Sequence, residues 1–244
     1  MEIHTHEERQ SLGQAAAAIG ASRIRASIAS RGFATVVVAT GTSQYELIEY
    51  LIGKPVEWAK VTLFHLDEYV GLPATHPASF RNYLRKRLVS HLPSLGAFHE
   101  IDGENEARRE CERLSALISQ HPIDVLFAGI GENAHLAFND PPADFEEAAP
   151  YIVVTLDEAC RRQQVGEGWF KSVADVPGKA ISMTIRQIMS AELLVISVPD
   201  ERKARAVRCS IEGPVTPDCP ASILQRHPQC HLYLDRASAS LLAR

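Results

Sequence analysis

The sequence predicts a single α/β domain built on a mainly parallel, doubly wound sheet. Short runs of β-branched residues alternate along the chain with longer segments of helical periodicity. Strands that alternate with helices favour parallel pairing, with helices on both faces of the sheet. No repeat or low-complexity linker divides the 244 residues, so residues 1–244 are expected to form one domain.

The individual elements follow from local composition. Helices are expected where Ala, Leu, Glu and Arg dominate with helical spacing of apolar positions, and strands where short β-branched runs occur. In chain order, the expected elements are helix Glu8–Ser30, strand Ala34–Ala39, helix Gln44–Ile52, strand Val61–Leu66, helix Ser79–Leu88, helix Glu104–Gln120, strand Asp124–Ala128, strand Ile152–Leu156, strand Leu193–Val198, helix Arg202–Ile211 and strand His231–Leu234.

Composition narrows the class of partner. A net charge of −5 and a pI near 6.1 provide no basic field for nucleic acid or an anionic membrane, which favours a small-molecule ligand. The five cysteines form no CxxC pair, so neither a disulfide framework nor a structural zinc site is expected. The chain shows no export signal and no apolar run long enough to span a bilayer, and a reducing cytoplasm is the expected location.

The N-terminal histidines raise the question of a metal site. His4 and His6, with Glu7 and Glu8, form an HxH pattern of the kind that binds metal in some hydrolases. The interpretation we favour is an acidic, solvated start to the first helix.

Ligands of doubly wound sheets bind beyond the carboxyl ends of the strands, so residues that follow strands are the first candidates. Thr40, Gly41, Thr42 and Ser43 follow the strand Ala34–Ala39 and precede a helix. Their N–H groups and hydroxyls at the positive end of a helix suit a phosphate. A simple N-cap by Thr42 or Ser43 explains the same residues, and no nucleotide-type P-loop motif follows.

The second strand, Val61–Leu66, leads into Asp67 and Glu68. Adjacent side chains at a strand end point to opposite sides, so one carboxylate can face a ligand while the other packs or hydrogen-bonds. Asp67 is a candidate general base, and Glu68 a candidate substrate contact or supporting residue. The alternative is a turn-forming Asp ahead of Gly71 and Pro73.

The third strand ends in the most informative segment of the chain. Gly129 and Gly131 have the spacing of a dinucleotide fingerprint, but Pro141 and Pro142 stop the long helix that such a fingerprint requires. A glycine turn that presents His135 and Asp140 favours acid–base chemistry, because a carboxylate can orient an imidazole and support its cationic form. The alternative for His135 is a solvated or capped loop residue.

Cationic candidates for an anionic ligand lie further along the chain. Arg161 and Arg162 either reach an anion or form a solvated helix face. Lys203 opens the helix after the strand Leu193–Val198, where it either neutralises a phosphate or stays exposed.

Together these segments resemble the glucosamine-6-phosphate deaminase family, within the larger group that also holds 6-phosphogluconolactonases. The resemblance is carried by Asp67-Glu-Tyr-Val-Gly-Leu-Pro73 with His76-Pro-Ala-Ser79, by His135-Leu-Ala-Phe-Asn-Asp-Pro141, by Glu212-Gly213 and by Ile223-Leu-Gln-Arg-His-Pro228. Lactonases instead tend to follow the corresponding histidine with a Ser-Leu-Phe-Pro type of sequence, which is absent here.

The resemblance implies a modified Rossmann-like sheet, no metal and no redox cofactor. It also implies a reaction in which an amino sugar phosphate opens, isomerises through an enolamine and leaves as a ketose phosphate and ammonia. Asp67 would move the proton between C2 and C1, and His135 would open the pyranose ring with support from Asp140. The Thr40–Ser43 loop and Lys203 would hold the phosphate. A mobile lid would correspond to Gln163–Lys171, with hinges at Gly166 and Gly168.

Several positions depart from the family pattern. Asn133 replaces an Asp, Ala134 replaces a Gly, and Asp140 replaces a longer Glu. Asn133 is still able to orient His135 by hydrogen bonding. A phosphate-binding Arg of the family aligns near Gln164, which leaves Arg161 or Arg162 as substitutes.

The basic residues that bind an allosteric sugar phosphate in some members are replaced by Tyr151 and Val153, so that regulation is expected to be missing. The departures predict a relative with altered activity or an epimeric substrate.

Three other functions remain in competition at this stage. One is a lactonase in which His135 activates water, and another is a sugar-phosphate sensor without catalysis. A dinucleotide-dependent oxidoreductase is disfavoured by Pro141 and Pro142. The sequence is compatible with a homo-oligomer but does not predict the assembly.

Overall fold

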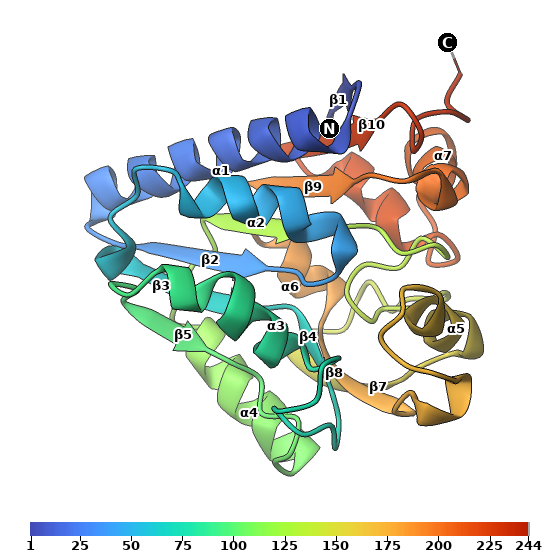
Figure 1. Ribbon diagram of the computed structural model, residues 1–244, viewed down its shortest axis with the longest axis horizontal. Helices are drawn as coiled ribbons and strands as arrows, with labels where there is room; N and C mark the ends of the chain where they lie inside the picture. Colours follow the sequence, from blue (N-terminus) through green and yellow to red (C-terminus); the bar gives the residue numbers. More distant parts are fainter. Residues whose placement is uncertain (244) are drawn as a thin grey trace.

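The computed structural model describes residues 1–243 and contains two β-sheets of different size (Figure 1). All pairs in the larger sheet are parallel, and both pairs in the smaller sheet are antiparallel. Across the larger sheet the strands are β1 (Glu2–His6), β10 (Cys230–Asp235), β9 (Leu194–Val198), β6 (Val125–Ala128), β2 (Ala34–Val38), β3 (Val61–His65) and β5 (Ala97–His99). The smaller sheet consists of β4 (Asp67–Tyr69), β8 (Lys179–Met183) and β7 (Tyr151–Thr155).

Helices cover both faces of the larger sheet. They are α1 (Arg9–Arg31), α2 (Tyr45–Ile52), α3 (Phe80–Arg87), α4 (Ala107–Ile118), α5 (Glu158–Gly166), α6 (Ile185–Met189) and α7 (Ala204–Glu212). Val36 and Val38 point into one core layer with α1, α2 and α3, whereas Val37 points into the opposite layer with α4, α6 and α7. This alternation follows from the two-residue period of a strand, and it confirms the predicted doubly wound α/β fold.

Every strand and helix expected from the sequence is present, with boundaries shifted by a few residues. The strand expected at Ile152–Leu156 is β7, which pairs antiparallel with β8 in the smaller sheet. The short elements β1, β4, β5, β8, α5 and α6 were not expected. Most of them are five residues or shorter, too short for a periodic pattern to be distinctive.

The N-terminal segment was expected to begin a helix, and that prediction is wrong. Residues Glu2–His6 form the edge strand β1, because β10 supplies the hydrogen-bonding partners. His4 Nε2 lies 3.1 Å from His231 Nδ1, with the ring planes inclined by 6° and the ring centroids 5.4 Å apart. Glu2 Oε2 lies 3.8 Å from His4 Nε2 and 3.4 Å from His231 Nδ1. The N-terminal groups that lie close enough to share a metal ion are therefore Glu2, His4 and His231, and not the HxH pair of the sequence.

Two further features bear on the sequence expectations. Cys209 and Cys219 form a disulfide that joins α7 to the segment before the 3-10 helix η6 (Pro220–Arg226), a bond that the cysteine spacing did not predict. Within residues 1–243, no helix is long and apolar enough to cross a membrane.

Strand order places the ligand site. From β2 the chain proceeds to β3 on one side, and from β6 it proceeds to β9 on the other, so the winding reverses between β2 and β6. The crevice outside the carboxyl ends of the strands at such a reversal is the usual ligand position in doubly wound sheets.

Candidate active site

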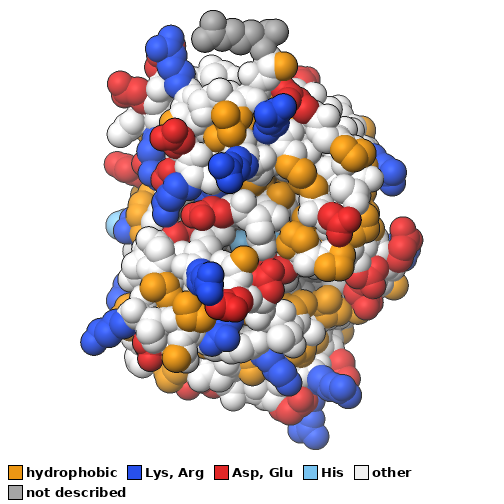
Figure 2. Space-filling model, turned by 90° about the vertical axis from the view of Figure 1, so that its right-hand side faces the viewer, with side chains coloured by type: hydrophobic (Ala, Val, Ile, Leu, Met, Phe, Trp, Pro, Cys, Tyr) orange, Lys and Arg blue, Asp and Glu red, His pale blue; other side chains and the backbone are white. Residues whose placement is uncertain are grey.

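A cavity opens at this reversal point, beyond the carboxyl ends of β2, β3 and β6. It holds about 770 Å³ of empty space, including the part open to solvent, which lies within the roughly 300–1,000 Å³ range of small-molecule sites. Figure 2 looks onto this edge of the molecule, where charged side chains of both signs surround a hollow. The predicted residues that line the cavity are Thr40, Gly41, Thr42, Ser43, Asp67, Gly129, Gly131, His135 and Lys203.

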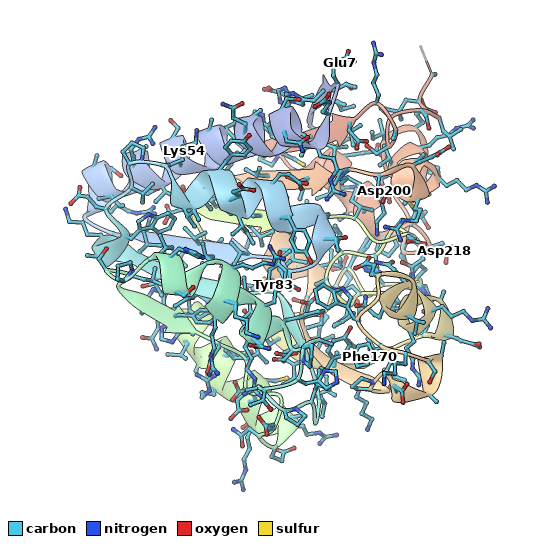
Figure 3. The ribbon with its side chains drawn as sticks, in the orientation of Figure 1. Glu7, Lys54, Tyr83, Phe170, Asp200 and Asp218 are labelled. Carbon is cyan, nitrogen blue, oxygen red and sulfur yellow. A yellow bond between two sulfur atoms is a disulfide. The ribbon has the colours of Figure 1, made fainter. Side chains whose placement is uncertain are left out.

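The loop after β2 forms one wall of the cavity. Gly41 has φ +97°, a left-handed conformation that glycine adopts without steric cost, and the 3-10 turn η1 (Thr42–Gln44) then leads into α2. The Tyr83 hydroxyl, labelled in Figure 3, donates to the Gly41 carbonyl at 3.0 Å, and Arg9 Nη2 donates to the Thr42 carbonyl at 2.7 Å. The loop is thus fixed at the positive end of α2, an arrangement that attracts an anion.

Lys203 provides a cation that lines the same cavity as this loop. It ends the 3-10 helix η5 (Glu201–Lys203), directly before α7, and only 7% of its side chain is exposed. It is therefore not the exposed helical lysine considered as an alternative. Burial lowers the pKa of Lys203, although the nearby Glu167 carboxylate acts to raise it.

Asp67 lies where the chain changes sheets. After β3 the backbone leaves the larger sheet at Leu66, whose carbonyl accepts from Met183 N at 2.7 Å, and Asp67 then pairs with Ser182 of β8. Asp67 lines the cavity but is only 7% exposed. Burial, with a further contribution from the Glu68 carboxylate, raises the pKa of Asp67 to about 8.

Glu68 points away from the cavity and holds the start of α3. Its carboxylate accepts from Ser79 Oγ at 2.8 Å and from the backbone N–H groups of Phe80 and Arg81 at 3.1 and 2.9 Å. Asp67 and Glu68 thus take different tasks at one strand end, since the first lines the cavity and the second supports the fold around it.

Asp140 and Asn133 orient His135. Its Nδ1 lies 3.1 Å from Asp140 Oδ1, so the shorter carboxylate does reach the ring. Asn133 Nδ2 donates to the same oxygen at 3.0 Å, and Asn133 Oδ1 accepts from His135 N at 3.2 Å. Burial acts to raise the pKa of Asp140, but the His135 and Asn133 interactions outweigh it and lower the pKa, which keeps the carboxylate ionised.

Gly131 gives the imidazole its space. A Cβ at this position would lie 2.3 Å from His135 Cε1 and 2.4 Å from His135 Nε2, too close for any side chain. Gly129 similarly lies against Ser43, whose Oγ would be 3.0 Å from an added Cβ. The two glycines serve close packing around the site, a role different from pyrophosphate binding.

We expect Gly131→Ala to lower kcat about 100-fold, because the added methyl group displaces the His135 ring by a distance comparable to 1 Å. Steady-state kinetics with a matched Gly178→Ala variant provide the test, since an added Cβ at Gly178 meets nothing within 4 Å. Equal activity of the two variants would contradict the close packing of Gly131 against the imidazole.

Arg161 and Arg162 do not reach the cavity, which corrects the expectation that one of them binds the anion. Arg162 pairs with Glu158 on the surface of α5, and its side chain is 68% exposed. Arg161 Nη2 donates to the carbonyls of Val173 and Val176 and so stabilises the segment after α5. The solvated helix face considered as the alternative describes Arg162.

Several cavity residues were not found from the sequence. Gln164 lines the wall and accepts from the Tyr69 hydroxyl at 2.7 Å. Arg9, Gln163, Glu167, Trp169 and Arg202 also line the cavity. Four of them, Gln163, Gln164, Glu167 and Trp169, lie in the segment that the family resemblance implies as a lid, whereas Arg9 carried no signal because it begins a helix far away in sequence.

The site has one cluster of metal-ligating atoms. His135, Asp140 and Cys160 each bring one such atom within 4.8 Å of the others. Burial raises the pKa of the Cys160 thiol. His135 Nδ1 lies 3.1 Å from Asp140 Oδ1, an arrangement that suits proton transfer through an imidazole oriented by a carboxylate.

Comparison with known proteins places these observations in a family. The model of the glucosamine-6-phosphate isomerases/6-phosphogluconolactonase family matches residues 7–232. The chain is 39% identical over 209 residues to the glucosamine-6-phosphate deaminase of Exiguobacterium sibiricum, which covers 86% of this chain and 81% of that protein. It is 34% identical over 211 residues to the deaminase of Lactobacillus delbrueckii subsp. bulgaricus, covering 86% and 88%.

Among solved structures, too, a deaminase is more similar to this chain in sequence than a lactonase is. A monomeric glucosamine-6-phosphate deaminase superposes with a TM-score of 0.89 at 30% identity, covering 99% of this chain and all of that one. The 6-phosphogluconolactonase of Trypanosoma brucei superposes with a TM-score of 0.82 at 17% identity, covering 99% and 98%, which shows a shared fold alone.

Proposed function

The chain belongs to the family of glucosamine-6-phosphate isomerases and 6-phosphogluconolactonases, and on that premise we propose that it is an amino-sugar-phosphate deaminase. The reaction converts glucosamine 6-phosphate or an epimer into the ketose 6-phosphate and ammonia. One observation carries the proposal. Asp67, a buried carboxyl, and His135, an oriented imidazole, line the same cavity as Lys203 and the Thr40–Ser43 loop, which we call the phosphate-type loop.

Substrate binding begins with the phosphate. The Thr40–Ser43 loop offers N–H groups and hydroxyls at the start of α2, and Lys203 offers a positive charge in the same cavity. The sugar then extends toward Asp67 and His135 on the β4 and β6 side of the cavity.

The chemistry requires two proton-transfer groups. His135 takes the proton from the anomeric hydroxyl and returns one to the ring oxygen, which opens the pyranose to an aldehyde with an amine at C2. Asp67 removes the C2 proton as O1 gains one, giving an enolamine, and then delivers a proton to C1. Water adds to C2 of the resulting imine and ammonia leaves, so that atoms and charge balance.

Asp67 favours deamination over lactone hydrolysis. A lactonase needs one group to activate water, and His135 alone would meet that need. The cavity contains in addition a buried carboxyl whose raised pKa suits a group that both accepts and donates a proton near neutral pH. The deaminases that resemble this chain are also at least 30% identical to it.

The implied partner is a small, anionic metabolite. A sugar phosphate carries a charge that keeps it inside the cell, so we place the enzyme in the cytoplasm. No nucleic acid or membrane partner is proposed, because the net charge of −5 offers no basic surface field.

The decisive experiment supplies purified protein separately with glucosamine 6-phosphate, galactosamine 6-phosphate and 6-phosphogluconolactone. Ammonia and ketose phosphate from either amino sugar would establish deamination and identify the epimer. Acid release from the lactone alone would establish the lactonase instead. Binding of the amino sugar phosphates without turnover would indicate a sensor.

Lys203→Met is expected to raise KM about 100-fold with a much smaller change in kcat. The lysine contacts the phosphate in both the ground state and the transition state, and losing such uniform binding appears mainly in KM. Lys179→Met is the matched control, because Lys179 is exposed at the start of β8. A fall in kcat with unchanged KM would move Lys203 out of the phosphate contact.

A further inference from the structure

The carboxylate of Glu167 lies in the part of the cavity that the phosphate would enter. Its Oε1 is 3.8 Å from Lys203 Nζ and accepts a hydrogen bond from Gln163 Nε2 at 2.8 Å. Its Oε2 accepts from Trp169 Nε1 at 3.2 Å and would lie 4.0 Å from a Cβ placed on Gly41. Only 8% of the Glu167 side chain is exposed, so this negative charge sits between the phosphate-type loop and the buried lysine.

The other cations around the cavity already have acidic partners. Arg9 Nε is 3.0 Å from Glu46 Oε1. Arg202 contacts Asp200, labelled in Figure 3, at 2.9 Å and Glu132 at 3.7 Å.

Within residues 1–243, the ion pair of Lys203 is with Glu167 alone. Each of the three Lys and Arg residues that line the cavity therefore has a carboxylate within 4 Å.

A phosphate cannot be added to this arrangement without a change. A phosphate that reaches Lys203 would lie within a few ångströms of the Glu167 carboxylate in a site largely shielded from water. Like charges at such a separation repel by several times more than they would in bulk water. One of the two anions has to leave the lysine.

We propose that Glu167 holds the place of the substrate phosphate in the ligand-free protein, and that phosphate binding displaces its carboxylate from Lys203. This inference rests on the proposed function for the identity of the anion. Glu167 is thereby a specificity-determining residue: it admits ligands whose phosphate competes successfully for Lys203 and disfavours neutral sugars, which leave the Lys203–Glu167 pair closed.

The displacement reaches Trp169 as well. The indole N–H donates to the carboxylate that leaves, and Glu167 and Trp169 flank Gly168, which has φ +83°. Gln163, on the last turn of α5, loses its acceptor at the same moment. The segment at the end of α5 therefore changes its contacts as a unit when phosphate binds.

The first test measures phosphate affinity in wild type and in Glu167→Gln, which keeps the shape of the side chain and one of its two acceptor oxygens but removes its charge. Isothermal titration with inorganic phosphate and with glucose 6-phosphate is expected to give about tenfold or greater tightening in the variant, since the competing charge is gone. Glu158→Gln removes the same charge from the exposed face of α5 and is expected to change the affinity less than about twofold.

The second test follows the indole. Trp58 and Trp169 are the two tryptophans of the chain, and Trp58 lies in the core away from the cavity, so Trp58→Phe leaves Trp169 as the fluorescent reporter. Phosphate is expected to shift the Trp169 emission in this variant, and the shift is expected to disappear when Glu167→Gln is added.

Unchanged or weaker phosphate affinity in Glu167→Gln overturns the inference, as does an emission that phosphate does not alter. These outcomes are separable from failure of the proposed function. Deaminase turnover by wild type together with no tightening in Glu167→Gln rejects the displacement alone. Tightening in the variant without turnover of any amino sugar phosphate rejects the deaminase assignment alone.

Discussion

Asp67→Asn is expected to lower kcat by at least about 1,000-fold while sugar-phosphate affinity changes less than about threefold. The substitution removes the proton acceptor but leaves the phosphate-type loop and Lys203 intact, and a general base contributes roughly 100- to 10,000-fold. Steady-state kinetics and calorimetric titration of the substrate measure the two quantities. Turnover close to wild type in this variant would remove Asp67 from the mechanism.

The pH dependence gives an independent check on the same residue. The base has to be ionised in the free enzyme, and burial places the pKa of Asp67 at about 8. The kcat/KM of wild type is therefore expected to rise with pH up to about 8 and then to level off. A profile that rises near pH 4, the ordinary range of an exposed carboxyl, would show that Asp67 is not buried in this way.

The raised pKa of Asp67 also makes the free energy of unfolding depend on pH. Between pH 4 and about 8, folded Asp67 holds a proton that the unfolded chain has released, so the free energy of unfolding falls as pH rises through this window. One such proton is worth about 1.4 kcal/mol per pH unit. Because Asp67→Asn removes this term, the Tm of the variant relative to wild type is expected to increase from pH 4 to pH 8.

His135→Gln is the second change with a large expected effect, a fall in kcat of about 100- to 10,000-fold. The amide keeps hydrogen-bonding capacity but does not move a proton between the anomeric hydroxyl and the ring oxygen. The exposed His91→Gln is the matched control, since His91 lies outside the cavity. Similar losses in both variants would point to a general effect on folding.

A second readout separates the roles of His135 and Asp67. The reverse reaction is measured in deuterium oxide with ammonium and the ketose phosphate. Exchange of the C1 proton for deuterium depends on Asp67, but it depends less on ring opening because part of the ketose is already open in solution. Exchange in His135→Gln is therefore expected to fall less than forward turnover, whereas Asp67→Asn loses both. Equal losses of exchange and turnover in His135→Gln would contradict a role in ring opening.

The sequence could predict that Asp67 and His135 lie in one cavity because strand ends are local features. Asp67 and His135 each follow an apolar run, and the parallel order of a doubly wound sheet brings such strand ends to one edge. Arg9 was not found because tertiary packing alone brings it to the cavity, and Glu167 was indicated only as part of the lid that the family resemblance implies. The positive charge of Arg162 suggested that it binds an anion, but its position on α5 directs the side chain to solvent.

The smaller sheet also could not be predicted from local sequence patterns. β4 has only three residues and exists because β8 pairs with it from more than a hundred residues away in the chain. Neither segment carries an alternation long enough to predict a strand. This pairing nevertheless holds Asp67 opposite Ser182, so the position of a cavity residue depends on the least predictable part of the fold.

The edge strand β1 has a consequence for the order of folding. Its hydrogen bonds are made with β10, the strand most distant from it in sequence, and among residues 1–243 no second strand pairs with it. Closing such a long loop costs more chain entropy than forming β2, β3 and the helices between them, so this edge is expected to form late. Its amide hydrogens should accordingly exchange with deuterium oxide sooner than those of β2 and β6. The edge strand β1 is thus able to open while the central strands next to the cavity stay intact.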